Sequence, residues 1–294
     1  MIETIHPEQL DCGEGPMWDS DARRLYWTNA VGQAIYSYDR SAEAVTTLTE
    51  SVQAGSITVH ADGGLLLGGG KGFYHWKSDG DIRVVADSCD DKPVAHINDI
   101  IADPSGRVFG GPESYNEEEP YEPGYLYCID LDGSIRIVEE GLHLSNGMGF
   151  SPDGSTFYHI DSIPRIVSAY DYDQQTGSIK NRRALIALTQ DDGLPDGMTV
   201  DSEGFIWIAL WFGGAVVRFD PDGKRERTIE LPVAQPSSVM FGGPDLNELY
   251  ITSAGLMWES PIAPAGHDYS RPRGGPLFRV SLDITGKPEN QARV

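Results

Sequence analysis

The chain has 294 residues, of which 39% are hydrophobic and 23% charged, a composition typical of a globular protein with a sizeable core. Its 22 basic and 45 acidic residues give a formal charge of −23, which argues against nucleic acid and anionic membranes as partners. No run of 18 apolar residues predicts a membrane span. The opening MIETIHPEQL lacks the pattern of a secretory signal, and three cysteines without a CxxC pair suit a reducing compartment, so a cytoplasmic location is expected.

Short β-rich segments separated by Asp-Gly or Ser-Gly turns run along the whole chain, and helical periodicity is almost absent. One pattern repeats: a polar or small residue, then a turn, then an apolar strand. In chain order, the repeats begin at Glu14, Gly55, Asn98, Asn146, Asp196 and Ser237, which are 41 to 50 residues apart. Third strands follow in several repeats, as at 34–39, 124–130 and 215–220, and a weaker fourth strand is expected at 44–49.

A unit of four strands repeated six times at this spacing predicts a β-propeller. We therefore expect an all-β fold, a six-bladed β-propeller with four-stranded antiparallel blades around a central channel, in which residues 1–294 form a single domain. A strand from the N-terminal decapeptide or from the C-terminal tail is expected to complete the sixth blade, which removes the free edges of an open array. The acidic run 117–119 is interpreted as a solvated loop, with a metal-binding or gating role as the alternative.

The residues that begin the repeats are expected to form a ring, because the first strand of each propeller blade lines the channel. Two carboxylates and two carboxamides would then face one another at one mouth, with small residues in the other two places. Carboxylates crowded near a low-dielectric axis are costly unless a cation neutralises them, so the ring predicts a metal site. The alternative is that each residue only shapes a turn, a role that suits Pro195-Asp196-Gly197. Asp201, five residues after Asp196, is interpreted as such a turn residue.

Several short motifs occur in a fixed order between about residues 11 and 282. They are Gly13-Glu14-Gly15-Pro16 before Trp18, Asn98-Asp99, Ser145-Asn146-Gly147, Pro195-Asp196-Gly197 and Phe241-Gly242-Gly243-Pro244-Asp245. Together they resemble the SMP-30/gluconolactonase family, the regucalcin-like lactonases. The resemblance implies one catalytic divalent cation at the channel mouth, held by Glu14, Asn146 and Asp196. It also implies that Asn98 contacts substrate or completes the coordination, and that Asp196 is the catalytic base.

The donor types favour a hard cation, because all four side chains offer oxygen and none is His or Cys. Ca²⁺ is the expected ion; Mg²⁺ and Mn²⁺ also suit these donors, and Zn²⁺ or Fe²⁺ is less expected. Such an ion polarises the carbonyl of a lactone and lowers the pKa of bound water, and a carboxylate at its edge takes the proton. The sequence thus predicts a metal-dependent hydrolase that opens a small-molecule lactone, a cyclic carboxylic ester.

Two departures from the family pattern bear on the substrate. His96 stands where sugar-acid lactonases of the family usually have arginine, and Gly111-Pro112-Glu113, with Tyr115 nearby, replaces the usual Gly-Thr-Met. Histidine cannot copy the paired hydrogen bonds of arginine to substrate oxygens, so a lactone less polar than a typical aldonolactone is expected. Together with Asn98, the candidate substrate-binding residues are His96, Glu113, Tyr115 and Trp211. For His96 and Trp211, structural packing is the alternative.

Two functions of other classes fit the same ring. A propeller can be a binding module whose metal only braces the channel, or it can hydrolyse organophosphates by attack on phosphorus. Metal binding without turnover of any lactone would indicate the first function. Phosphotriesterase activity above lactonase activity would indicate the second.

Overall fold

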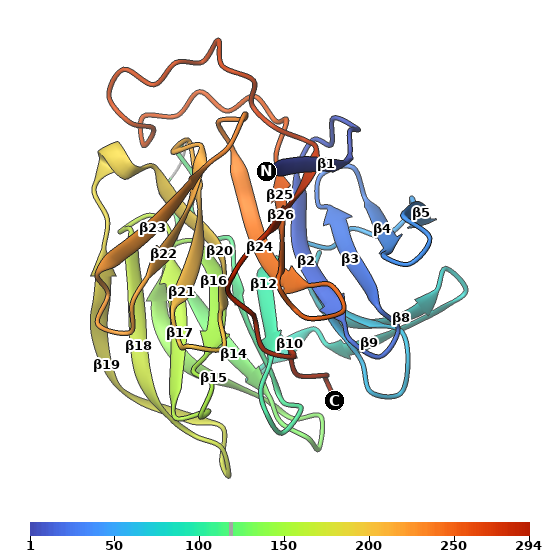
Figure 1. Cartoon of the computed structure of the whole chain (residues 1–294). Helices are drawn as coiled ribbons and strands as arrows, with labels where there is room; N and C mark the ends of the chain where they lie inside the picture. The colour runs from blue at the N-terminus through green and yellow to red at the C-terminus, as the bar shows by residue number, and fades with distance from the viewer. Residues whose placement is uncertain (118–119) are drawn as a thin grey trace.

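The computed structural model describes residues 1–117 and 120–294, so most of the acidic run predicted as a loop lies outside the described residues. Six four-stranded antiparallel sheets surround a central axis (Figure 1), which confirms the predicted six-bladed β-propeller. A 3₁₀ turn at Gln190–Asp192 is the one helical segment among the described residues. None of these residues belongs to a helix long and apolar enough to cross a membrane.

The blades follow one another along the chain, each with its first strand at the axis. Blade 1 contains β2 (Gly13–Asp19), β3 (Arg24–Asn29), β4 (Ala34–Asp39) and β5 (Ala44–Thr49); blade 2 contains β6 (Ser56–Val59), β7 (Leu65–Gly69), β8 (Gly72–Ser78) and β9 (Asp81–Ala86). Blade 3 contains β12 (Ile97–Ala102), β13 (Val108–Pro112), β14 (Gly124–Ile129) and β15 (Ile135–Leu142); blade 4 contains β16 (Ser145–Phe150), β17 (Thr156–Asp161), β18 (Ile166–Asp173) and β19 (Ser178–Ala187). Blade 5 contains β20 (Leu194–Val200), β21 (Ile206–Trp211), β22 (Ala215–Phe219) and β23 (Arg225–Glu230). A small hairpin of β10 (Ser88–Cys89) and β11 (Lys92–Pro93) joins blades 2 and 3.

The N-terminus, not the C-terminus, completes the sixth blade. Its sheet has the order β1 (Ile2–His6), β26 (Leu277–Ser281), β25 (Glu248–Ser253) and β24 (Pro236–Gly242), with β1 at the outer edge. His6, at the end of β1, packs its ring against Trp27 and Tyr36 of blade 1. One strand therefore closes blade 6 and joins it to blade 1.

The C-terminal tail runs across the end of the propeller opposite the mouth (Figure 1). It forms isolated β-bridges from Gly286 to Asp201 of blade 5 and from Ala292 to His60 of blade 2. Between these two points, Glu289 lines the lower channel together with residues of the inner strands. The mouth at the beginning of the inner strands is therefore the end available to a substrate.

Most inner strands carry a β-bulge where the predicted ring residue lies. The register shifts between Glu14 and Met17, Ile97 and Asp99, Ser145 and Met148, Pro195 and Met198, and Pro236 and Val239. A bulge re-aims side chains and increases the local twist. Pro195-Asp196-Gly197 is accordingly a bulged stretch within β20, and the alternative of a simple turn is wrong.

The glycines that follow the ring residues are required by close approach of neighbouring blades. A Cβ on Gly197 would lie 1.9 Å from Oγ of Ser238, and one on Gly147 would lie 2.4 Å from the backbone nitrogen of Met198. Neither glycine has a positive φ. Glycine is required at both positions because it has no side chain, which lets the neighbouring inner strands pack closely around the axis.

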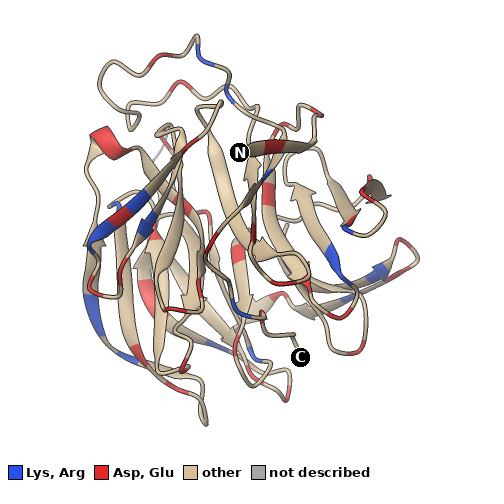
Figure 2. Cartoon of the chain, viewed as in Figure 1, with Lys and Arg blue, Asp and Glu red and all other residues tan. Residues whose placement is uncertain are grey.

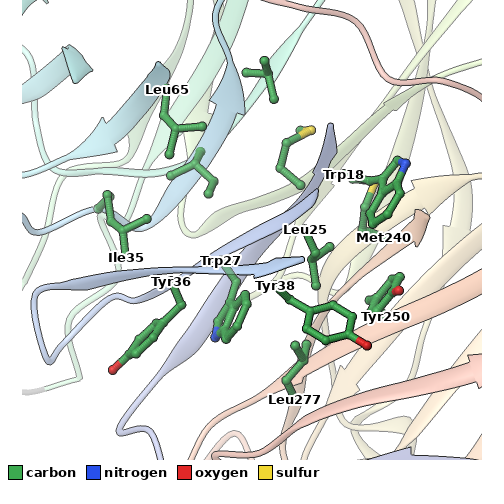
Figure 3. Packing of buried hydrophobic residues seen from close by; sticks show 14 of the residues in the cluster. Trp18, Leu25, Trp27, Ile35, Tyr36, Tyr38, Leu65, Met240, Tyr250 and Leu277 are labelled. Atoms are coloured by element: carbon green, nitrogen blue, oxygen red, sulfur yellow. The ribbon is translucent and has the colours of Figure 1, made fainter. Parts of the chain in front are cut away.

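Apolar side chains fill the spaces between adjacent blades. Trp18 of blade 1 stacks on Tyr250 of blade 6, with ring centroids 5.9 Å apart, and both are buried (Figure 3). Acidic residues are spread over the loops at both ends of the propeller (Figure 2). The charge therefore lies mainly outside a core that is built from the faces of the sheets.

Asp201 is more than a surface turn residue. One of its carboxylate oxygens accepts hydrogen bonds from the backbone N–H groups of Glu203 and Phe205, as a turn former does. The other accepts from Nε1 of Trp207 at 2.9 Å and from Nε of Arg218 at 2.8 Å, and the side chain is fully buried. Asp201 is thus the centre of a buried ion pair, which the turn pattern alone did not indicate.

Candidate active site

Two carboxylates lie at the mouth of the channel, the buried Asp196 and the partly buried Glu14. Glu14 begins the bulge of β2 and Asp196 that of β20, where Asp196 is only 6% exposed. Burial, and next the charge of Asp99, raise the pKa of Glu14 to about 8. Burial raises the pKa of Asp196 well above its ordinary value, and the negative charges of Glu14, Asp99 and Glu113 raise it further. The two predicted carboxylate ligands therefore lie close enough to repel each other in a site of low polarity.

The two predicted amides are joined to each other. Nδ2 of Asn98 donates to Oδ1 of Asn146 at 3.0 Å and to the backbone carbonyl of Ser145 at 2.9 Å. Nδ2 of Asn146 donates to Oγ of Ser162 at 2.9 Å, and that hydroxyl donates to the carbonyl of Pro195 at 2.6 Å. A chain of hydrogen bonds thus crosses three blades and ends beside Asp196.

The two small residues of the ring have structural roles. Oγ of Ser237 donates to the carbonyl of Gly13 at 2.5 Å, which ties blade 6 to the strand that carries Glu14. At Gly55, a Cβ would lie 2.5 Å from the backbone oxygen of Asn98. Small residues at these places allow the polar residues of the other blades to approach the axis.

Asp99 faces the same channel and was not among the predicted site residues. It lies in the lining of the channel, and its pKa is raised to about 6 by burial, against the effect of a hydrogen bond with Ser56. Successive residues of a regular strand point to opposite sides, so a regular β12 would not direct both Asn98 and Asp99 into the channel. The bulge in β12 between Ile97 and Asp99 removes that alternation, and a sequence pattern does not display such a bulge.

The donor set fits a divalent cation. Residues 1–117 and 120–294 contain no group of three or more His, Cys, Asp or Glu side chains able to hold a metal ion. The predicted ligand set is not such a group, because its third donor, Asn146, is an amide and not one of these four residue types. Glu14 raises the pKa of Asp196, and Asp99 that of Glu14, so both carboxylates gain from a neighbouring positive charge, and the amide oxygen adds a neutral hard donor. We conclude that Glu14, Asn146 and Asp196 suit a hard cation.

Blade 3 supplies the predicted substrate-binding residues His96, Glu113 and Tyr115. The backbone N–H of Glu113 donates to the carbonyl of His96 at 3.2 Å, so these two residues are neighbours at the ends of β12 and β13. Glu113 is exposed, yet its charge raises the pKa of Asp196, which places it on the mouth side. Between β13 and β14, the ring of Tyr115 packs edge-on against that of Tyr121, with centroids 5.6 Å apart.

Trp211 belongs to an apolar cluster beside the carboxylates. The cluster contains Leu194, Trp211, Phe212, Ala254 and Ala263, with Cys12, Trp258 and Ile262 packed against it. Cys12 lies two residues before Glu14, and after burial it is the charges of Glu14 and Asp196 that most raise the pKa of its thiol. Nε1 of Trp211 is buried without a hydrogen-bond partner among the described residues.

The loop 254–276, which contains Trp258 and Ile262 of this cluster, lies above the blades at the mouth end of the propeller (Figure 1). Arg165 of blade 4 donates to the carbonyl of Ile262 at 2.5 Å, and Gln190 donates to that of Ala263 at 2.6 Å. Ser260 reaches Glu117 of blade 3. This loop was not predicted as part of the site, although its length between two strands is the signal that marks a functional loop.

Comparison with known proteins agrees with this arrangement. Residues 12–255 match the pattern that defines the SMP-30/Gluconolactonase/LRE-like region. The chain belongs to this family. The match begins just before Glu14 and ends in the loop after β25, so all of the predicted ligands lie within the part that defines the family.

Relatives and neighbours of this SMP-30/gluconolactonase-like chain match it over nearly its full length. Pentonolactonase XacC of Haloferax volcanii is 38% identical over 282 residues, which cover 96% of this chain and 94% of that protein. A luciferin-regenerating enzyme has a TM-score of 0.87 and 27% identity, covering 100% of this chain and 99% of that one. Regucalcin from Agrobacterium tumefaciens, described as a calcium-binding protein, shares the fold with a TM-score of 0.84 and 23% identity, covering 99% and 97%.

Proposed function

We propose that the protein is a divalent-metal-dependent hydrolase that opens a lactone ring. The observation that carries the proposal is the pair of carboxylates, the buried Asp196 and the partly buried Glu14, beside an amide chain at the channel mouth of a propeller of this family. The name of the relative from Haloferax volcanii supports a lactone as the substrate. The oxygen donors and the calcium-binding neighbour support Ca²⁺ as the ion.

In the proposed reaction Glu14, Asn146 and Asp196 would hold the cation, which would supply a Lewis acid for the lactone carbonyl and a lower pKa for the attacking water. Asp196 takes a proton from the attacking water, whose oxygen bonds to the carbonyl carbon. The ring C–O bond then breaks, and Asp196 returns the proton to the departing alkoxide, which gives a hydroxy acid. Asn98, whose Nδ2 is held by two hydrogen bonds, orients the substrate through its Oδ1.

The proposed substrate has an apolar side. Trp211 and Trp258, with ring centroids 6.2 Å apart, form an aromatic wall in the cluster that contains Leu194, two residues before Asp196, while Glu113 repels anionic groups. Together with His96 in place of arginine, this wall supports a lactone less polar than a typical aldonolactone. A pentonolactone is the direct comparison, because it is the substrate class in the name of the 38% identical relative.

The test is a hydrolysis screen with a pH indicator on metal-free protein to which Ca²⁺, Mg²⁺, Mn²⁺, Zn²⁺ or Fe²⁺ is added. The panel contains sugar, aliphatic and aromatic lactones and a phosphotriester. Lactone hydrolysis that requires added metal is the expected result. Metal that binds only the folded state at 100 times its Kd stabilises by about 2.7 kcal/mol, so chelation should also lower the melting temperature.

Three outcomes would contradict the proposal. Metal binding without turnover would make the protein a binding propeller, and faster cleavage of the phosphotriester would make it an organophosphate hydrolase. An unchanged melting curve after complete removal of metal would show that no cation is bound at the site in the folded protein.

A further inference from the structure

Ser162 lies directly behind the proposed metal ligands. It follows β17 in blade 4 and is 1% exposed. Its Oγ lies 2.9 Å from Nδ2 of Asn146 in the same blade and 2.6 Å from the carbonyl oxygen of Pro195 in blade 5. Because Pro195 immediately precedes Asp196, one hydroxyl joins a ligand of one blade to the strand that carries a ligand of the next.

The directions of these hydrogen bonds follow from the number of protons available. A carbonyl oxygen only accepts and a serine hydroxyl has a single proton, so Ser162 donates to Pro195. The oxygen of Ser162 then has only acceptor capacity left, and the Asn146 group that faces it has to be the amide nitrogen. The amide oxygen of Asn146 is thereby turned to the other side, toward Asn98 and the ring.

Asn98 is oriented by the same reasoning. Both partners of its Nδ2, the carbonyl of Ser145 and Oδ1 of Asn146, are oxygens that accept. If Asn146 turned over, two NH₂ groups would face each other and the bond between the amides would be lost. The carbonyl of Ser145 thus fixes the amide of Asn98, and the hydroxyl of Ser162 fixes the NH₂ end of Asn146, so Asn146 is held in one orientation from both sides.

We propose that Ser162 is the positioning residue that holds the oxygen, and not the nitrogen, of Asn146 toward the cation. The inference rests on the proposed function, because it requires a cation in the ring. An amide NH₂ carries partial positive charge and cannot ligate a metal, so each molecule with a reversed Asn146 loses one of the three ligands. Ser162 contacts neither substrate nor metal and acts through Asn146 and the backbone before Asp196.

The test is calorimetric titration of the metal-free protein with CaCl₂, which reads metal affinity without any turnover. For Ser162→Ala we expect an affinity about 10- to 100-fold below that of the wild type, the usual loss when a residue behind a metal ligand is removed. Ser162→Cys keeps nearly the same volume with a much weaker hydrogen bond, and it provides the same reading if the alanine variant does not fold. Ser162→Thr keeps the hydroxyl and should restore much of the affinity.

Ser253→Ala is the matched control. Ser253 is fully buried, and its Oγ donates to the carbonyl of Pro276 at 2.6 Å and accepts from the N–H of Gly275 at 3.0 Å. The side chain therefore has the same geometry and burial as that of Ser162 but contacts none of the proposed ligands. Its variant should lose comparable stability and keep the calcium affinity of the wild type.

Asn146→Asp distinguishes positioning from general support of the fold. A carboxylate presents an oxygen to the ring whichever way it is turned, so adding Ser162→Ala to Asn146→Asp should lower the affinity far less than in the wild-type background. An equal loss in both backgrounds overturns the inference, as does a wild-type affinity in Ser162→Ala. If the wild type itself binds none of the divalent ions, the metal part of the proposed function fails and the inference fails with it.

Discussion

At the scale of single residues, two aspartates five positions apart in blade 5 have different surroundings. Asp196 lies among other carboxylates at the channel mouth, where burial and like charge raise its pKa. Asp201 is paired with Arg218 and Trp207 at the other end of the blade. Breaking a buried ion pair costs about 3–5 kcal/mol, so a substitution of Asp201 would report on stability and not on catalysis.

Asp196→Asn is expected to fold normally and to be nearly inactive, even at saturating metal. The neutral amide cannot accept a proton from water, and loss of a general base costs roughly 10²- to 10⁴-fold in kcat. Asp220→Asn is the control: Asp220 shapes the turn 220–223 in the same blade through bonds to backbone N–H groups that asparagine also makes. Comparable kcat values for the two variants would return Asp196 to a purely structural role.

His96→Arg is expected to shift the substrate preference toward sugar lactones. Arginine offers a planar fork of donors for substrate hydroxyls, which histidine lacks. The measurement is kcat/KM for a pentonolactone and for an aliphatic lactone, with wild type and variant in parallel. A wild type that prefers the pentonolactone to every less polar lactone would contradict the role given to His96.

At the scale of elements, the second strand of blade 4 contains a buried histidine that makes stability depend on pH. His159 is 1% exposed and contacts Oγ of Ser145 at 2.8 Å. Burial lowers its pKa to about 4, and Arg182 acts in the same direction while Asp161 opposes it. The unfolded chain takes up this proton near pH 6.5 and the folded chain only near pH 4, so the contribution is complete above pH 6.5 and is lost as the pH falls to about 4.

His159→Gln should remove this dependence, because glutamine places an amide nitrogen where Nε2 lies and does not titrate. We expect the wild type to lose about 3 kcal/mol more than the variant between pH 7 and pH 4, from the shift of about 2.5 pKa units. Urea unfolding at the two pH values measures the free energy of unfolding of both proteins. The titration of the mouth carboxylates affects both equally and therefore cancels in the comparison. Equal losses in the two proteins would show that the histidine does not carry the effect.

At the scale of the whole molecule, the ring is closed by one N-terminal strand. Deletion of residues 1–6 removes the outer strand of blade 6 and the contacts of His6 with blade 1. If residues 1–294 form a single domain, as we propose, the deletion should lower one common melting transition by several degrees, since 1 kcal/mol corresponds to about 2–4 °C in a domain of this size. Circular dichroism and tryptophan fluorescence should report the same midpoint, and two separate transitions would speak against a single domain.

The sequence by itself determined the number of blades, the order of the strands and four of the polar residues at the channel mouth. These features are local: each blade repeats its own alternation of apolar strand and turn, and each ring residue stands at the same place in the repeat. Glu14, Asn98, Asn146 and Asp196 could be named because the geometry of a propeller converts equal positions in the repeat into neighbours around an axis.

The tertiary structure alone decided what lies between the blades. The bulge that turns Asp99 into the channel, the hydroxyl of Ser162 that joins Asn146 to the strand of Asp196, and the loop 254–276 over the mouth all depend on contacts between distant parts of the chain. That the N-terminal strand closes blade 6 also depends on contacts between distant parts of the chain. No repeat pattern contains such contacts, because each is made by residues that are unique to their blade and that meet only when the ring has closed.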